Sequence, residues 1–124
     1  MAGPSSSASS PGTSLPEHRE AAAVAVFVAL ADPTRRHLLD RLARQGPATV
    51  TELADGLPIS RQAVAKHLVQ LAEAGLVEAG EADGRRLPYR LRPGPMRDAH
   101  AWLGVLANQW DDRLSALQSH LEGP

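Results

Sequence analysis

Apolar residues recur at seven-residue intervals through the last quarter of the chain. The two adjacent rows are Met96, Leu103, Trp110 and Leu117, and Ala107, Leu114 and Leu121. This spacing predicts one helix over residues 96–121, which is about 39 Å long at the standard rise per residue. A chain of 124 residues forms one small domain, which cannot cover a helix of that length. Since heptad stripes commonly pair with their own copy, we expect a homodimer; packing of the helix across its own domain is the alternative.

The chain contains no cysteine, which excludes a disulfide scaffold, a Cys-ligated zinc site, an iron–sulfur cluster and a thiol nucleophile. Its apolar residues are mostly alanine and leucine, which favour helix. The longest apolar stretch, residues 21–31, is about half of what a membrane span needs, and no secretory signal precedes it. We therefore expect a cytoplasmic protein without a membrane partner.

The N-terminal third divides into a tail and two helices. Residues 1–16 carry no charge and almost no large apolar side chain, so they predict a disordered tail ahead of a domain over residues 17–124. Residues 17–31 predict a helix that is apolar on nearly all sides, which indicates a subunit interface in so small a protein. Asp32 and Pro33 break this helix and open the next, because they suit an N-cap and a first helical position.

Two short helices joined by a tight turn are expected in the middle of the chain. A β-prone run at residues 48–50 precedes a helical segment at residues 51–55 and a glycine-containing turn at residues 56–59. Ser60 then caps an amphipathic helix over residues 61–74. This order is the helix-turn-helix arrangement.

A β-hairpin is predicted directly after these helices. Residues 76–77 and 87–91 read as its strands, and Asp83 and Gly84 form a strong turn signal between them. Pro88 confines the second strand to an edge position. The fold class is therefore α+β, mostly α.

Charge is distributed unevenly along the chain. Residues 35–97 hold eleven basic and seven acidic residues, a net charge of +4, whereas the segments before and after them carry −2 and −3. A basic middle indicates a polyanionic partner, although chance clustering of solvated charge is an equally plain reading.

The helix over residues 61–74 has one apolar and one polar face. Val64, Leu68 and Leu71 define the buried face at 100° per residue. The groups left facing outward at its N-terminal end are Ser60, Arg61, Gln62, Ala65 and Lys66. Glutamine can contact adenine, arginine and lysine can reach guanine or phosphate, and the small residues allow close approach. A solvated helix face would carry similar residues, so the preceding turn and the following hairpin strengthen the case.

Five further arginines are candidates for the DNA backbone. Arg85, Arg86 and Arg90 lie on or beside the hairpin, where they can reach a phosphate or the minor groove. Arg35 and Arg36 are weaker phosphate candidates at the start of the second helix.

Four segments resemble the ArsR family of bacterial winged helix-turn-helix repressors. They are ALADPTRR at residues 29–36, TELA at 51–54, SRQAVAKHL at 60–68 and LAEAGLV at 71–77. The pattern covers about residues 20–92. The resemblance implies a homodimeric repressor of operator DNA with a recognition helix at residues 61–74 and a wing at residues 76–92. It also implies that long N- and C-terminal helices form the dimer.

The chain departs from the metal-sensing members of that family. Their Cys-containing motif falls where this chain has residues 51–55, which contain no cysteine. Asp98 and His100 match half of a second type of site, but the other half would fall at Asp111 and Leu114, and leucine cannot ligate. We expect no metal and no other cofactor; a metal-responsive repressor remains the first alternative.

The second alternative is a winged helix that binds protein instead of DNA. An enzyme is not expected, because the histidines form no catalytic constellation and no glycine-rich phosphate loop follows a strand.

Overall fold

The computed structural model describes residues 15–123 of the chain. Its elements in order are α2 (Leu15–Leu30), α3 (Pro33–Gln45), α4 (Val50–Ala54), α5 (Arg61–Glu73), β1 (Val77–Ala79), β2 (Tyr89–Leu91) and α6 (Gly94–Glu122). The predicted α+β, mostly helical class is confirmed. Of the predicted tail, residues 1–14 lie outside the described residues, and α2 begins at Leu15, ahead of its predicted start at Glu17.

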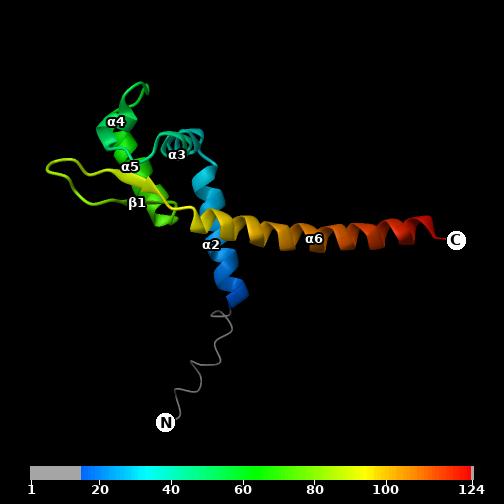
Figure 1. The fold of residues 1–124 in the computed structure, drawn as a ribbon. Coiled ribbons are helices and arrows are strands. Elements are labelled where there is room, and N and C mark those ends of the chain that lie inside the picture. Colours follow the sequence, from blue (N-terminus) through cyan, green and yellow to red (C-terminus); the bar gives the residue numbers. More distant parts are fainter. Residues whose placement is uncertain (1–14, 124) are drawn as a thin grey trace, which may run out of the picture.

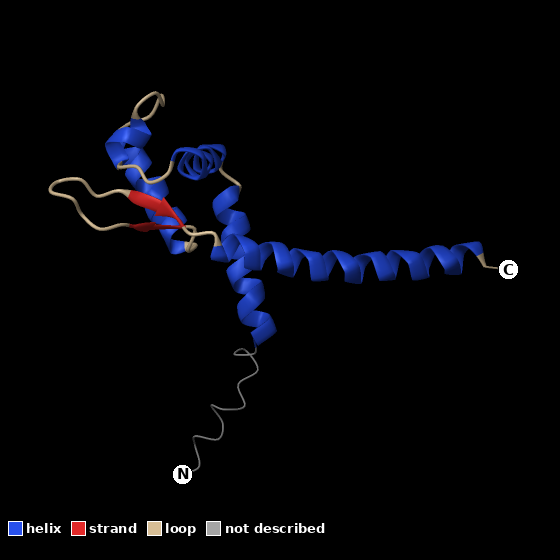
Figure 2. Cartoon of the chain, viewed as in Figure 1, coloured by secondary structure: helices blue, strands red, loops and turns tan. Residues whose placement is uncertain are grey.

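The elements form a cluster from which one long helix extends. Figure 1 shows α3, α4, α5 and the hairpin together at one end of the molecule, while α2 crosses the beginning of α6. Figure 2 shows that the hairpin holds the strands and that helices make up the rest of the ordered cluster. The strands are antiparallel, with Val77 opposite Leu91. The predicted strands are residues 76–77 and 87–91. In the structure the first strand begins one residue later and runs on to Ala79, and the second begins only at Tyr89, so that the two pair over three residues.

Side-chain caps begin three of the helices. Asp32 and Ser60 each accept the backbone N–H three residues on, at 3.0 and 3.1 Å, as predicted. The predicted β-run at residues 48–50 is wrong beyond Ala48. Thr49 instead caps α4, and the Glu52 carboxylate accepts the Thr49 N–H at 2.9 Å in a reciprocal capping box. Two satisfied N–H groups make a helix start more favourable there than an extended strand.

The hairpin turn matches its prediction. Asp83 and Arg86 exchange N–H···O bonds of 2.8 and 2.9 Å in both directions. Since the sheet has two strands, β2 lies at an edge, as Pro88 predicts. Only Tyr89 of this strand has a partner on its outer side. Tyr89 exchanges hydrogen bonds of 3.0 and 2.8 Å with Ala48, which ties the hairpin to the segment before α4.

Aliphatic side chains of α2, α3, α4, α5 and the hairpin, together with Ala99 of α6, form one core. The largest fully buried ones are Val26, Leu38, Leu53, Val64, Leu68, Leu71, Leu76 and Val77. The predicted inward face of α5 is confirmed, since it buries Val64, Leu68 and Leu71. The neighbouring α3 buries Leu38, Leu39 and Leu42. Within residues 15–123 no polar or charged residue is buried, so the core depends on non-directional aliphatic packing.

Small residues allow α2 and α6 to cross closely. Ala23 and Val26 of α2 and Ala99 of α6 are buried at 1–3% exposure. The rings of Phe27 and Trp102 add an aromatic contact beside them, with centroids 6.1 Å apart. This crossing anchors the first turns of α6 to the rest of the chain.

Both crossing helices keep a large apolar surface in contact with solvent. Its members are Val24, Phe27 and Val28 on α2, and Met96, Leu103, Trp110, Leu114, Leu117 and Leu121 on α6. Val105 is also exposed, on the opposite side of α6. The prediction that the first helix is apolar on nearly all sides is thus confirmed. Every described residue of α6 after position 106 is exposed, and Figure 1 shows that part of the helix projecting away from the other elements.

We expect Leu68→Ala to lower the free energy of unfolding by about 2–5 kcal/mol, because it opens a cavity at a fully buried site. The neighbouring Val69, which is 53% exposed, provides the matched control. Val69→Ala should change stability by no more than about 0.5 kcal/mol. Urea denaturation followed by circular dichroism measures both. Equal effects of the two substitutions would contradict the orientation of α5.

Candidate nucleic-acid interface

The N-terminal half of α5 presents a polar surface held in place by its buried face. Arg61, Gln62 and Lys66 are exposed, whereas Val64 and Leu68, on the other side of the same turns, have no exposed surface. Ser60 caps the helix, and Ala65 is half-buried between the two faces. Each predicted outward residue therefore lies on or beside the solvent face of one rigid element.

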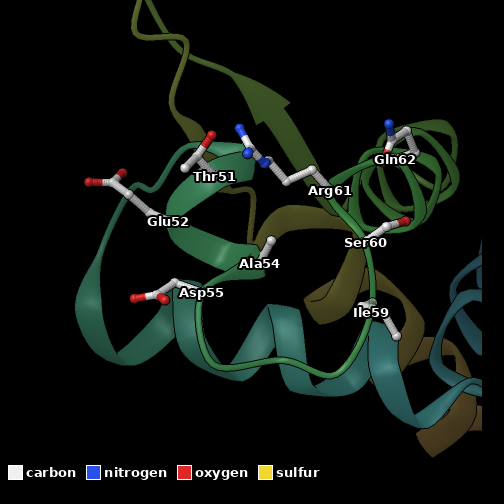
Figure 3. A pocket seen from close by; sticks show the side chains of 8 residues that line it. All are labelled: Thr51, Glu52, Ala54, Asp55, Ile59, Ser60, Arg61 and Gln62. Atoms are coloured by element: carbon white, nitrogen blue, oxygen red, sulfur yellow. The ribbon is translucent and has the colours of Figure 1, made fainter.

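A hollow of about 620 Å³ lies between α4 and the beginning of α5. It is lined by Thr51, Glu52, Ala54, Asp55, Ile59, Ser60, Arg61 and Gln62. Figure 3 shows the Arg61 side chain extending toward Thr51, while Gln62 points away from α4. The α5 side of this concave junction thus carries a cation, a hydroxyl group and an amide, whereas the α4 side carries the Thr51 hydroxyl and the carboxylates of Glu52 and Asp55.

Carboxylates hold two of the three hairpin arginines. Arg86 pairs with Glu52 at 2.9 Å and Arg90 pairs with Glu78 at 2.7 Å. Arg85 is exposed at the turn and makes no hydrogen bond or ion pair within residues 15–123. Because solvent-exposed ion pairs are worth little, a phosphate can compete for the paired guanidinium groups. The Arg86–Glu52 pair meanwhile joins the hairpin to α4.

Arg35 and Arg36 differ from their prediction as phosphate ligands. The Arg35 Nε donates to the Ala29 carbonyl at 2.7 Å, and the Arg36 Nη1 donates to the Leu30 carbonyl at 2.6 Å. Both guanidinium groups therefore cap the C-terminus of α2, where unpaired carbonyls and the helix dipole favour a cation. The helix break at Asp32 was the sequence signal for this role, because it places both arginines one turn beyond a helix end.

The described residues bring no metal site together. Asp98 and His100 are exposed near the start of α6, and residues 15–123 contain no group of three or more His, Asp or Glu side chains placed to hold a metal ion. His37 on α3 is exposed as well. None of the helices in this part of the chain has the length and apolar character that crossing a bilayer requires.

These features define a winged helix-turn-helix protein, because a solvent-facing helix follows a short helix and turn and a basic hairpin lies beside it. A family model described as a helix-turn-helix domain matches residues 30–79. The transcriptional repressor SdpR of Bacillus subtilis is 32% identical over 89 residues, which are 72% of this chain and 97% of SdpR. An ArsR-like transcriptional regulator from Rhodococcus sp. RHA1 superposes with a TM-score of 0.75 at 37% identity, over 85% of this chain and 97% of that one. The chain belongs to the ArsR family of transcriptional regulators.

Other relatives match over a shorter part of their length. The regulator Rv2034 of Mycobacterium tuberculosis is 52% identical over 65 residues, which are 52% of this chain and 59% of Rv2034. The arsenic resistance regulator ArsR1 of Pseudomonas putida is 40% identical over 68 residues, 55% of this chain and 52% of ArsR1. The chain therefore spans little more than half the length of these two relatives.

The capping box makes stability depend on pH through Glu52. The Thr49 N–H, assisted by the Thr49 hydroxyl and Arg86, holds the pKa of the Glu52 carboxyl below its usual value. A lowered folded-state pKa means that the charged form stabilises the fold at neutral pH, and that this contribution is lost as the pH falls through that pKa. The Tm difference between the wild type and Glu52→Gln should thus be present at about pH 7 and shrink below about pH 4.

Thermal melts followed by circular dichroism measure this difference. The matched control is Glu81→Gln on the hairpin, since Glu81 is exposed and makes no hydrogen bond or ion pair within the described residues. A Tm difference for Glu52→Gln that stays constant across the acidic range would contradict the assigned role of the carboxylate.

Proposed function

We propose that the chain is a homodimeric, sequence-specific repressor that binds double-stranded operator DNA in the cytoplasm. The observation that carries the proposal is the surface of α5, whose exposed cations and amide stand opposite a fully buried aliphatic row. Membership of a transcriptional regulator family and the relative named as a repressor support it. The proposal requires neither a catalytic group nor a cofactor, and it describes a regulator, not an enzyme.

In this proposal the beginning of α5 enters the major groove. Gln62, Arg61 and Lys66 contact base edges or the adjacent phosphates, since their side chains are exposed on the N-terminal turns. Ser60 retains its cap and presents its hydroxyl near a phosphate, and half-buried Ala65 lets the helix approach the bases.

The hairpin acts as the wing. Arg85 is already free to meet a phosphate or the minor groove, because it makes no ion pair within the described residues. Arg86 and Arg90 exchange Glu52 and Glu78 for phosphate on binding. These contacts position the protein on the duplex, whereas α5 reads its sequence.

A second copy of the chain covers the apolar surface of α2 and α6. Side chains such as Phe27, Trp110 and Leu117 are 37–54% exposed, and they continue the contact between Phe27 and Trp102 along α6. Many large apolar side chains exposed along the same two helices indicate an interaction site. Its heptad spacing on one helix favours an identical partner, because a two-fold axis repeats the same stripe.

Gln62→Ala and Lys66→Ala should weaken DNA binding in different ways. Loss of a base contact by Gln62→Ala should cost about 1–3 kcal/mol on the preferred sequence and little on random DNA. Loss of a phosphate contact by Lys66→Ala should weaken binding to both and reduce the salt dependence. Fluorescence anisotropy titrations at several salt concentrations, on a duplex selected from a random pool, measure both effects.

The control is Gln45→Ala, the same truncation at the exposed end of α3, which should leave affinity unchanged. If Gln62→Ala and Lys66→Ala also bind the selected duplex like the wild type, α5 is not the recognition helix. A wild type that shows no salt-dependent affinity for DNA would favour the protein-binding alternative.

Leu103→Asp combined with Leu117→Asp should produce a folded monomer that no longer binds the operator. Both leucines are about half exposed in the single chain, so charges there cost little until a partner covers them. The matched control is Asn108→Asp with Ser119→Asp, which adds the same charge to the opposite face of α6. Sedimentation velocity and circular dichroism report assembly and fold, and a dimeric leucine double variant would contradict the assigned interface.

A further inference from the structure

One arginine joins the end of α2 to the recognition helix. The Arg35 guanidinium donates from Nε to the Ala29 carbonyl at 2.7 Å and from Nη2 to the Val28 carbonyl at 3.1 Å. Its remaining nitrogen, Nη1, donates to the Gln70 side-chain oxygen on α5 at 2.8 Å. This planar group thus links the end of α2 to Gln70, which lies 35 positions after Arg35 in the sequence.

A second contact lies one turn earlier on α5. Asp32, which caps α3, accepts the Arg35 backbone N–H at 3.0 Å, and the same oxygen lies 3.9 Å from the His67 Nδ1. That nitrogen is buried and has no hydrogen-bond partner among residues 15–123, and the Asp32 carboxylate lies nearby. His67 and Gln70 are three residues apart on one side of α5, and both meet the junction between α2 and α3.

The remaining contacts of α5 with the core are less directional. Its buried residues are Val64, Leu68 and Leu71, and aliphatic packing tolerates small rotations and shifts of a helix better than a fork of hydrogen bonds does. Arg36 caps the same end of α2 through Leu30 but makes no hydrogen bond to α5. Both arginines therefore cap the end of α2, but of the two only Arg35 also binds α5.

We propose that Arg35 is a positioning residue for DNA recognition, which fixes the orientation of α5 relative to α2 through Gln70. The inference rests on the proposed function, in which α2 belongs to the dimer interface and α5 enters the major groove. A dimer reads two half-sites at a fixed separation of about one helical turn, or a multiple of it. The angle between its interface helix and its recognition helix therefore determines which spacing fits.

Three substitutions that keep the net charge test the proposal: Arg35→Lys, Gln70→Met and, as the matched control, Arg36→Lys. Lysine keeps the cation near the end of α2 but lacks the planar fork, so it cannot hold the three acceptors at once. Arg35→Lys and Gln70→Met should each lose about tenfold in affinity for a two-half-site operator, the loss expected for one hydrogen bond to a charged group. Both should bind an isolated half-site like the wild type, and Arg36→Lys should match the wild type on both duplexes.

Two further readouts separate positioning from a general loss of stability. The double variant Arg35→Lys/Gln70→Met should lose no more than either single variant, because both remove the same link. An operator with one base pair inserted between its half-sites should lose less affinity with these variants than with the wild type, since their recognition helices are less fixed. Two results would overturn the proposal. One is a double variant whose loss of affinity is the sum of the two single losses, and the other is a loss of affinity for the isolated half-site as large as that for the full operator.

A spin-label measurement tests positioning without DNA. The chain has no cysteine, so exposed Glu20 on α2 and exposed Ala72 on α5 can each be replaced by a labelled cysteine, with excess unlabelled protein to suppress distances between subunits. The distance distribution should broaden in Arg35→Lys and Gln70→Met and stay narrow in Arg36→Lys. Distance distributions that do not change in these variants overturn the inference, even if the wild type binds its operator. A wild type that binds no duplex overturns the proposed function instead, and the distance distributions then still test the role of Arg35.

Discussion

The burial of the aliphatic row on α5 is the constraint on which the rest of the structure depends. Val64, Leu68 and Leu71 have no exposed surface, so the helix cannot turn through a large angle without exposing them to water or burying polar groups in an apolar core. That rotation decides which side chains of the same helix face solvent. Gln62 and Lys66 are available to a ligand because the core has taken the opposite face.

Charged side chains near the interface serve two different purposes. Arg85 is unpaired within the described residues, whereas Arg86 and Arg90 are paired with carboxylates of their own chain. Arg35 and Arg36 donate hydrogen bonds to carbonyls at the end of α2. The net charge of +4 over residues 35–97 therefore overstates the number of cations that are free to meet a polyanion.

The single chain leaves large apolar side chains of α2 and α6 exposed to solvent. The single chain buries small residues such as Ala23 and Ala99 at the crossing and leaves larger ones such as Trp110 and Leu117 in water. In the proposed homodimer, a second copy would cover these larger side chains and add apolar contact to the small core of one chain. The α2–α3 junction connects this surface to α5, so the proposed dimer interface and the proposed recognition helix meet at neighbouring residues.

The sequence by itself determined the elements and the faces of the two amphipathic helices. The signals are local: the caps at Asp32 and Ser60, the turn at Asp83 and the heptad spacing of the long helix each depend on residues close together in sequence. Their effect therefore does not depend on the rest of the fold. The capping box at Thr49 was also present in the sequence, as threonine followed three residues later by glutamate, and the β-propensity of its neighbours concealed it.

Only the tertiary structure decided what the arginines do. Arg35, Arg86 and Arg90 look alike in the sequence, yet their partners are Gln70, Glu52 and Glu78, which lie 35, 34 and 12 positions away. Composition and periodicity cannot predict such pairs, because a long flexible arginine side chain can reach many acceptors. Only the packing of the core brings one of these acceptors within 3 Å. The sequence thus determined where the cations stand along the chain, and the packing of α5 against α2, α3 and the hairpin decided which of them face outward.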